Sequence, residues 1–188
     1  MKIVLASASE RRQELLVRIV EDFTVLVSEF DENSVKEKGS ISQYVEEIAF
    51  GKAKDVASRL KEGYIVIAAD TIVAINGEIL GKPINKEDAF KTLNKLSGNT
   101  HKVYTGLVLI NTSTSKILKS TESTEVIFSK LSKDDISKYI DSGEPMDKAG
   151  AYGIQGMGGV FVEGILGCYY NVVGLPLNRL HKMIKQII

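Results

Sequence analysis

Apolar and polar positions alternate along the chain with two periods, one typical of strands and one typical of helices. Short continuous runs of apolar, often β-branched residues predict buried strands over 2–6, 23–28, 103–111 and 117–128. Apolar residues that recur every three or four positions predict helices over 9–20, 42–60, 86–96, 133–142 and a C-terminal segment that Pro176 opens. Strands and helices therefore mix without strict alternation.

The segment "YIVIAADTIVAINGEILGKP", residues 64–83, predicts a hairpin. Its apolar run passes through Asp70 and Thr71 and continues to Ile75, where Asn76 and Gly77 give a strong two-residue turn signal before a return strand. We therefore predict an α/β fold with helices flanking a mixed sheet that contains mostly antiparallel strands, rather than a doubly wound parallel sheet.

Composition limits the class of protein. With 188 residues, of which 44% are hydrophobic, the chain suits one domain over residues 1–188, compact or with two lobes. Its 24 basic and 24 acidic residues give zero net charge, which argues against nonspecific nucleic-acid binding. Cys168 is the only cysteine and cannot form an intrachain disulfide. No apolar stretch approaches membrane-spanning length, so we expect a cytoplasmic protein without a membrane partner.

The stretch "LASASERRQELL", residues 5–16, allows two interpretations. A strand, a small-residue turn and a helix start together make an anion site, to which Ser7 and Ser9 add hydroxyl groups and Arg11 and Arg12 add guanidinium groups suited to phosphate. Alternatively, Ser7 and Glu10 form a capping box and the arginines are solvated helix surface. Arginines in a first helical turn oppose the helix dipole, which counts against the second interpretation.

Asp70 interrupts the apolar run of a predicted strand. Burial of an unpaired carboxylate there would cost several kcal/mol, so Asp70 is either a hydrogen-bonded structural residue, or a metal ligand or general base. The hairpin's return strand leads to Lys82, and Lys52 lies on a mostly apolar helix face. Mg²⁺ typically binds one or two carboxylates plus substrate phosphates, so Asp70 with Glu32 would suffice as ligands. Together with the arginines, these residues suit phosphoryl or nucleotidyl hydrolysis.

A glycine-rich segment, "DKAGAYGIQGMGGVF", follows at residues 147–161. Its glycines allow the backbone to approach a ligand closely, and Lys148 and Gln155 could supply specific contacts. The same pattern is also typical of ordinary turns. No Walker A and no G-x-G-x-x-G pattern occurs in the chain, so the sequence does not favour a P-loop or Rossmann site.

Five collinear motifs resemble those of the Maf family of nucleoside triphosphate pyrophosphatases: "LASASERRQELL", "AADTIVAINGEILGKP", "LSGNTHKVYTG", "DKAGAYGIQGMGG" and "NVVGLPL". The family usually reads Ser-Pro-Arg-Arg where this chain has Glu10 between Ser9 and Arg11. Proline and an acidic residue both suit the first position of a helix, so the departure leaves the arginines unaffected.

The resemblance implies a fold of the inosine-triphosphatase type, shared by Maf and Ham1 proteins, with an active-site cleft between two lobes. It implies cleavage between the α and β phosphates of a nucleoside triphosphate, with a divalent cation, Mg²⁺ or Mn²⁺. Asp70 would accept the proton of the attacking water, with Asp70 and Glu32 as the metal ligands. The phosphate and metal site would be lined by Ser7, Arg11, Arg12, Glu32, Lys52 and Lys82.

The resemblance also bears on the substrate and partners. The segment "AGAYGIQG", with Arg12, Thr71 and Gln155, looks like the branch that acts on dTTP and UTP rather than the branch that prefers methylated GTP. We expect free nucleoside triphosphates, normal or modified, as partners and no stable nucleic-acid binding; homodimers are common in such proteins. One alternative is a nucleotide- or nucleic-acid-binding regulator of septum formation without significant turnover. Another is a non-catalytic domain whose motifs are structural turns.

Overall fold

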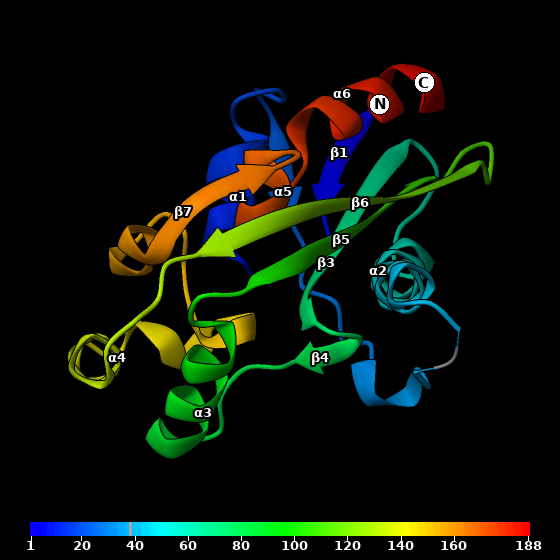
Figure 1. Cartoon of the computed structure of the whole chain (residues 1–188). Helices are drawn as coiled ribbons and strands as arrows, with labels where there is room; N and C mark the ends of the chain where they lie inside the picture. The colour runs from blue at the N-terminus through cyan, green and yellow to red at the C-terminus, as the bar shows by residue number, and fades with distance from the viewer. Residues whose placement is uncertain (38) are drawn as a thin grey trace. The chain divides into compact units, whose positions relative to one another are not determined.

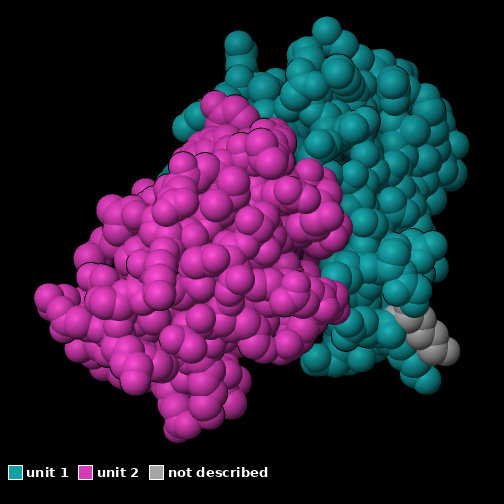
Figure 2. Space-filling model, in the orientation of Figure 1, with its two compact units in different colours: residues 1–70, 105–122, 174–188 teal, residues 71–104, 123–173 magenta. Residues whose placement is uncertain are grey.

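The computed structural model describes residues 1–37 and 39–188, which divide into two compact units. Unit 1 comprises residues 1–70, 105–122 and 174–188, and unit 2 comprises residues 71–104 and 123–173 (Figure 2). Each unit is therefore assembled from segments that lie far apart in the sequence. Among the residues described, every helix is too short or too polar to traverse a lipid bilayer.

The strands belong to a seven-stranded sheet in the order β2-β1-β3-β5-β6-β7, with β4 paired to β3 (Figure 1). Their bounds are β1 (Lys2–Leu5), β2 (Phe23–Val25), β3 (Tyr64–Ile75), β4 (Glu78–Leu80), β5 (Thr100–Asn111), β6 (Ile117–Phe128) and β7 (Val162–Leu166). Strand β1 runs parallel to β2 and β3, with Ile3 opposite Phe23 and Ile65. Strand β4 is antiparallel to β3, and β7 is antiparallel to β6. The predicted mixed sheet is confirmed.

Several of the helices begin where the sequence supplies a side-chain cap. They are α1 (Glu10–Leu16), α2 (Ile41–Ser58), α3 (Lys86–Leu96), α4 (Lys133–Asp141), α5 (Tyr169–Val173), α6 (Leu177–Ile187) and the 3-10 helices η1 (Glu32–Ser34), η2 (Glu144–Asp147), η3 (Ala149–Ala151) and η4 (Met157–Phe161). Ser40 and Gln43 form a capping box on α2, and Asn85 caps α3 through the amide of Asp88. Pro176 precedes α6 directly, as predicted.

In unit 1, the apolar face of α2 packs closely on the sheet through small side chains. This cluster contains Val4, Ala6, Ala49, Ala53, Val56, Val66, Ala68, Val108 and Ile110. Gly106 of β5 must be a glycine because a Cβ there would lie 2.5 Å from the carbonyl oxygen of Val45 in α2. The close approach of α2 to the sheet brings Lys52, on the same helix, within reach of polar groups on β3.

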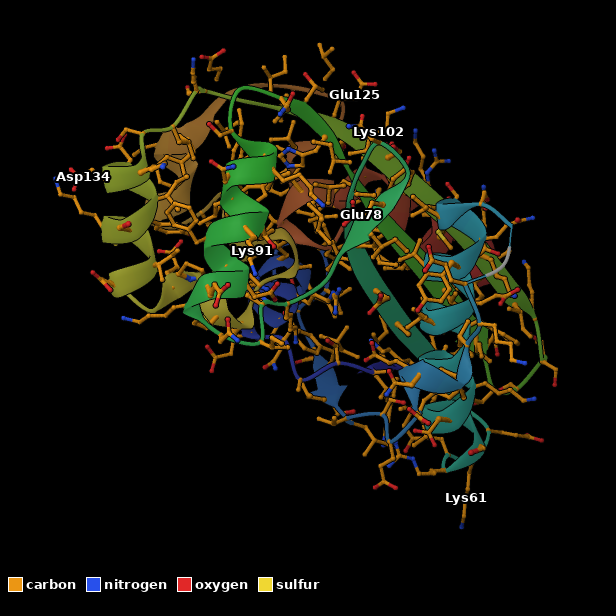
Figure 3. The ribbon with its side chains drawn as sticks, turned by 60° about the horizontal axis from the view of Figure 1, so that its bottom comes forward. Lys61, Glu78, Lys91, Lys102, Glu125 and Asp134 are labelled. Atoms are coloured by element: carbon orange, nitrogen blue, oxygen red, sulfur yellow. The ribbon has the colours of Figure 1, made fainter. Side chains whose placement is uncertain are left out.

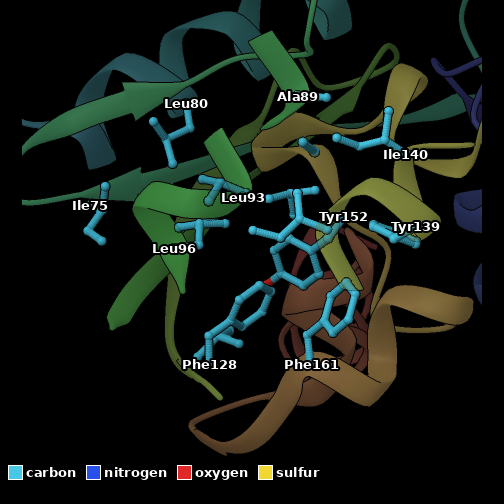
Figure 4. Packing of buried hydrophobic residues seen from close by; sticks show 14 of the residues in the cluster. Ile75, Leu80, Ala89, Leu93, Leu96, Phe128, Tyr139, Ile140, Tyr152 and Phe161 are labelled. Carbon is cyan, nitrogen blue, oxygen red and sulfur yellow. The ribbon is translucent and has the colours of Figure 1, made fainter. Parts of the chain in front are cut away.

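In unit 2, aromatic rings form the centre of a second core (Figure 4). Phe128 and Tyr152 meet edge to face with ring centroids 4.7 Å apart, and Tyr139 and Phe161 do so at 5.1 Å. Such pairs add about 0.5–1.5 kcal/mol each beyond the area that they bury. The core therefore fixes Tyr139, which precedes the glycine-rich segment, and Tyr152, which lies within it.

The surface of unit 2 carries charges of both signs, several of them in ion pairs (Figure 3). Lys102 and Glu125 pair across β5 and β6 at 3.4 Å, and Lys95 of α3 pairs with Glu78 of β4 at 2.7 Å. Exposed pairs of this kind contribute about 0–1 kcal/mol each, so they favour solubility more than stability.

Helix α1 and strand β2 end several residues earlier than predicted, and some elements were not predicted at all. Helix α1 ends at Leu16 instead of near Val20, because the amides of Arg18 and Ile19 bond carbonyls only three residues back. Strand β2 ends at Val25 instead of at residue 28, and beyond it the C-cap residue of α2, Arg59, donates to the Val27 carbonyl at 2.7 Å. The unpredicted elements are β7, α5 and the four 3-10 helices.

The hairpin prediction is confirmed. Asn76 and Gly77 both have positive φ, 51° and 82°, as a type I′ turn requires. The register pairs Val73 with Leu80 and Ile75 with Glu78. The turn therefore sends the chain back along β3 toward Lys82, which follows β4 by two residues.

Candidate functional site

Ser7 and Ser9 follow strand β1 and organise the start of α1. The Oγ of Ser9 accepts a hydrogen bond from the amide of Arg12 at 3.4 Å, so Ser9 is the N-cap. The predicted capping box of Ser7 with Glu10 is therefore wrong: a helix that begins at Glu10 takes the preceding residue as its cap. The buried Ser7 instead accepts hydrogen bonds from the amide of Ser9 at 3.2 Å and from Nη1 of Arg12 at 3.3 Å.

Arg12 is held by unit 1 from two sides. Its Nε donates to the carbonyl oxygen of Gly174 at 2.9 Å, and its Nη1 donates to Ser7. Burial lowers the pKa of the Arg12 guanidinium, the negative charges of Asp70 and Glu32 oppose that shift, and the positive charge of Arg11 adds to it. Arg12 is thus partly buried rather than part of a solvated helix surface, with the like charge of Arg11 beside it.

Asp70, Lys52 and Glu32 form a compact charged triad in unit 1. The Nζ of Lys52 in α2 lies 2.6 Å from Oδ1 of Asp70 on β3 and 2.8 Å from Oε1 of Glu32 in η1. The side chains of Asp70 and Lys52 are only 12% and 14% exposed, whereas that of Glu32 is 53% exposed. The carboxylate that interrupts the apolar run of β3 is therefore paired, and the triad opens to solvent on the side of Glu32.

Hydrogen bonds and one ring contact hold the loop that carries Glu32 against α2. Asp55 accepts hydrogen bonds from the amide of Glu29 at 2.9 Å and from Ser28 Oγ at 3.0 Å, and these bonds, led by that of Glu29, lower the pKa of Asp55. The ring of Phe30 lies against Gly51, where a Cβ would come within 2.3 Å of it. Gly51 immediately precedes Lys52, so this contact sets the loop beside the lysine that Glu32 binds.

Tyr44 is a neighbour of the triad that the sequence reasoning missed. Burial raises the pKa of its phenol, and the negative charges of Glu37, Asp70 and Glu32 raise it further. Tyr44 precedes Lys52 by eight residues on α2, about two helical turns, so the helical period could have placed the two on one side of the helix.

The remaining predicted residues lie in unit 2. Thr71 follows Asp70 in β3 and is partly buried, whereas Lys82 and Gln155 are exposed. The segments that carry the last two are joined, because the amide of Gly150 donates to the carbonyl oxygen of Gly81 at 3.1 Å. Gly150 has φ of 70°, and a Cβ there would lie 2.8 Å from Val73, so glycine is required at this junction.

The carboxylates of Asp70 and Glu32 suit a divalent cation. Both are hard oxygen donors, and in the structure they already share one positive group, the ammonium of Lys52. Among the described residues, no group of three or more His, Cys, Asp and Glu side chains converges as a metal cage. The chain would therefore supply two carboxylates, and a phosphate-bearing ligand would complete the coordination, which is the usual arrangement for Mg²⁺.

Residues 2–187 match the sequence model of a family described as "Maf-like protein". The chain is 57% identical over 188 residues to a dTTP/UTP pyrophosphatase of Clostridium botulinum (strain Alaska E43 / Type E3), with 100% of both chains covered. It is 58% identical to a dTTP/UTP pyrophosphatase of Clostridium perfringens (strain ATCC 13124), covering 99% of this chain and 97% of that one. A Ham1 protein of Staphylococcus aureus has the same fold, with a TM-score of 0.56 at 19% identity over 99% of each chain, which confirms the expected fold type.

Proposed function

The chain belongs to the Maf family, and we propose that it hydrolyses dTTP and UTP between the α and β phosphates. The products are the nucleoside monophosphate and pyrophosphate. The observation that carries this proposal is the triad of unit 1, in which Lys52 pairs with the buried Asp70 and with Glu32. The relatives that share more than half of its residues over its full length are dTTP/UTP pyrophosphatases, which supports this choice of substrate.

In the proposed mechanism, Asp70 acts as the general base. A water molecule attacks the α phosphorus and transfers a proton to the Asp70 carboxylate as the bond to the bridging oxygen breaks and pyrophosphate leaves. Asp70 is suited to this role because it is almost inaccessible to bulk water and Lys52 holds one of its oxygens at 2.6 Å. That contact fixes the carboxylate's orientation and leaves Oδ2 for the water.

The cations of the segment 7–12 are proposed to bind the phosphates. Arg12, fixed by Ser7 and Gly174, is preorganised, and Arg11 beside it adds a second guanidinium. Two adjacent like charges repel each other, and a bound polyphosphate would relieve that repulsion. When bound by Asp70 and Glu32, Mg²⁺ or Mn²⁺ would neutralise phosphate charge and polarise the phosphoryl oxygens. Unit 2 supplies Thr71, Lys82 and Gln155 as the further proposed substrate-binding residues.

We also propose that residues 1–188 form one enzyme domain that acts in the cytoplasm on free nucleoside triphosphates with a divalent cation. The carboxylates of the triad would repel a nucleic-acid backbone, and the zero net charge of the chain provides no general attraction for one. Modified pyrimidine nucleotides belong to the same proposed substrate class as dTTP and UTP.

A panel of nucleoside triphosphates tests the proposed function. The purified chain is incubated with each nucleotide and Mg²⁺ or Mn²⁺, and pyrophosphate and orthophosphate are measured separately. We expect pyrophosphate and monophosphate from dTTP and UTP, with less turnover of purine nucleotides. Orthophosphate as the direct product would move the cleavage to the terminal phosphate. Tight binding of nucleotides without release of pyrophosphate would favour a regulatory protein instead.

A further inference from the structure

Glu144 of η2 is a partly buried carboxylate on which three donor groups from two parts of unit 2, α4 and η4, converge. Its Oε1 accepts hydrogen bonds from the hydroxyl of Tyr139 at 2.8 Å and from the amide of Gly158 at 3.3 Å. Its Oε2 accepts a hydrogen bond from the amide of Met157 at 2.8 Å. One side chain therefore binds α4 and the start of η4, on the C-terminal side of Gln155.

Tyr139 extends the same network to the other side of Gln155. Its hydroxyl donates to Glu144 and accepts a hydrogen bond from the amide of Gly153 at 3.2 Å. Gly153 precedes Gln155 by two residues, and Met157 follows it by two. Gln155 itself is exposed, and the backbone on both sides of it is held by the pair Tyr139 and Glu144.

The glycines of this segment are explained by the same two side chains. A Cβ on Gly156 would lie 2.5 Å from both carboxylate oxygens of Glu144, and a Cβ on Gly158 would lie 2.6 Å from the hydroxyl of Tyr139. The backbone thus approaches polar atoms of unit 2 more closely than any other residue type would allow. The network and the glycines together define one conformation for residues 153–158.

The network requires a carboxylate. Burial raises the pKa of Glu144, but the hydrogen bonds from Met157, Tyr139 and Gly158 outweigh that effect, aided by the charge of Lys148, so the pKa is lowered. Three donors point at the two oxygens. A glutamine of the same shape offers one oxygen and one NH₂ group. Its NH₂ group cannot accept a hydrogen bond, so at least one of the three donors would lose its acceptor.

We propose that Glu144, through Tyr139 and the amides of Gly153, Met157 and Gly158, is the positioning residue that presents Gln155 to the nucleotide. This inference rests on the proposed function, which assigns Gln155 to substrate binding. Glu144 touches no reacting atom in this proposal. It holds residues 153–158 in one conformation before a nucleotide binds, so that these residues lose less conformational entropy on binding.

Glu144→Gln tests the proposal, with Glu163→Gln as the matched control on an exposed residue of β7. We expect Glu144→Gln to raise KM for UTP about tenfold with a much smaller change in kcat, the size expected for losing a charge-assisted hydrogen bond. In a Gln155→Ala background, the same substitution should change KM less than about twofold, because the residue that it positions is already gone. Exchange of the Met157 and Gly158 amides with deuterium should become faster in Glu144→Gln and stay unchanged in Glu163→Gln.

Three outcomes would overturn the proposal. The first is an unchanged KM in Glu144→Gln, and the second is a double variant in which the KM effects of Glu144→Gln and Gln155→Ala multiply independently. The third is a lower melting temperature as the only change in Glu144→Gln. If Glu144→Gln does not fold, Tyr139→Phe removes only the hydroxyl and should raise KM in the same direction. If the wild-type chain releases no pyrophosphate from any nucleotide, the proposed function fails. Equilibrium dialysis of UTP against the wild type, Glu144→Gln, Gln155→Ala and the double variant then decides whether Glu144 and Gln155 are coupled.

Discussion

At the residue scale, the candidate site depends on the environment of one carboxylate. Asp70 lies in the apolar strand β3 and contacts Lys52 at 2.6 Å, so its charge is compensated without solvent. Removal of a charged partner from such a pair usually costs several kcal/mol because the other charge is left buried. Here Lys52 keeps Glu32 at 2.8 Å, so a neutral residue at position 70 still leaves the lysine with a partner.

We therefore expect Asp70→Asn to fold and to lose turnover. Asparagine keeps the shape of the side chain but cannot accept the proton of the attacking water, and general bases contribute about 10²- to 10⁴-fold to rates. A fall in kcat for UTP of about 10³-fold, measured as pyrophosphate release, is the expected result. Asp141→Asn, on an exposed carboxylate that pairs with Lys86, is the control and should retain full activity. Full activity in Asp70→Asn would remove Asp70 from its proposed role.

The sequence predicted the residues that differ in polarity from their neighbours within one helix or strand. Asp70 stands out in an apolar run, and Lys52 stands out on an apolar helix face, so both could be selected before their 2.6 Å contact was known. Glu144 could not be selected in this way, because its role depends on amides that lie 13 and 14 residues away and on the hydroxyl of Tyr139. The cap at Ser9 was missed for a simpler reason: the helix begins at Glu10, two residues later than a cap at Ser7 implies.

At the element scale, α2 organises unit 1 on both of its sides. Its small residues pack on the sheet, and a second margin of the helix holds the loop of residues 27–32 through Asp55, the C-cap residue Arg59 and the contact of Phe30 with Gly51. Sequence periodicity predicted the helix but gave no sign of this margin, because the partners come from a loop without periodicity. Strand β7 was missed for a related reason: its short, glycine-containing run becomes a strand by pairing with β6.

Gly51→Ala tests whether this margin positions Glu32. A Cβ at position 51 would lie 2.3 Å from the ring of Phe30, so the ring and its loop must move. Overpacking of this kind costs about 1–3 kcal/mol of stability. We also expect the Mg²⁺ concentration for half-maximal activity with UTP to rise several-fold, since Glu32 would no longer be held at Lys52.

The matched control is Gly164→Ala in β7, where the nearest atom to an added Cβ lies at 3.9 Å. It should change neither stability nor the Mg²⁺ requirement. Adding Phe30→Ala to Gly51→Ala should restore part of the stability because the clashing ring is removed. An unaltered Mg²⁺ requirement in Gly51→Ala would show that the Phe30 contact does not position Glu32.

At the scale of the whole molecule, the fold class was predictable and the division into units was not. Strand and helix periods gave a mixed sheet with flanking helices, because those periods are local properties. Unit 1 is assembled from segments separated by 34 and 51 residues and unit 2 from segments separated by 18, and β3, β5 and β6 each contribute residues to both. The division depends on contacts between residues far apart in the sequence, which a local pattern does not reveal. Only the structure could therefore assign Asp70 and Thr71, which are neighbours in the chain, to different units.

The global stability of the chain should depend on the protonation of a histidine in the core of unit 2. His101 is 1% exposed, its Nε2 lies 2.8 Å from the hydroxyl of Tyr152, and its Nδ1 has no hydrogen-bond partner among the described residues. Burial lowers the pKa of His101 to about 4, whereas in the unfolded chain it is 6.5. Between these values the unfolded state binds a proton that the folded state does not, so the free energy of unfolding falls as the pH decreases from 6.5 to 4.

A difference of this size corresponds to roughly 3 kcal/mol, present in full above pH 6.5 and lost by pH 4. Carboxylates titrate in the same range, so the contribution of His101 is isolated by comparing urea unfolding of the wild type and of His101→Gln at pH 7.5 and pH 4.5. Glutamine is neutral at both pH values, so His101→Gln should lose less stability than the wild type between pH 7.5 and pH 4.5, even if it is less stable at pH 7.5. His181→Gln, on an exposed residue of α6, should retain the wild-type dependence. Equal losses in wild type and His101→Gln would mean that the histidine accepts a proton in the folded state, with the core of Phe128 and Tyr152 accommodating the charge.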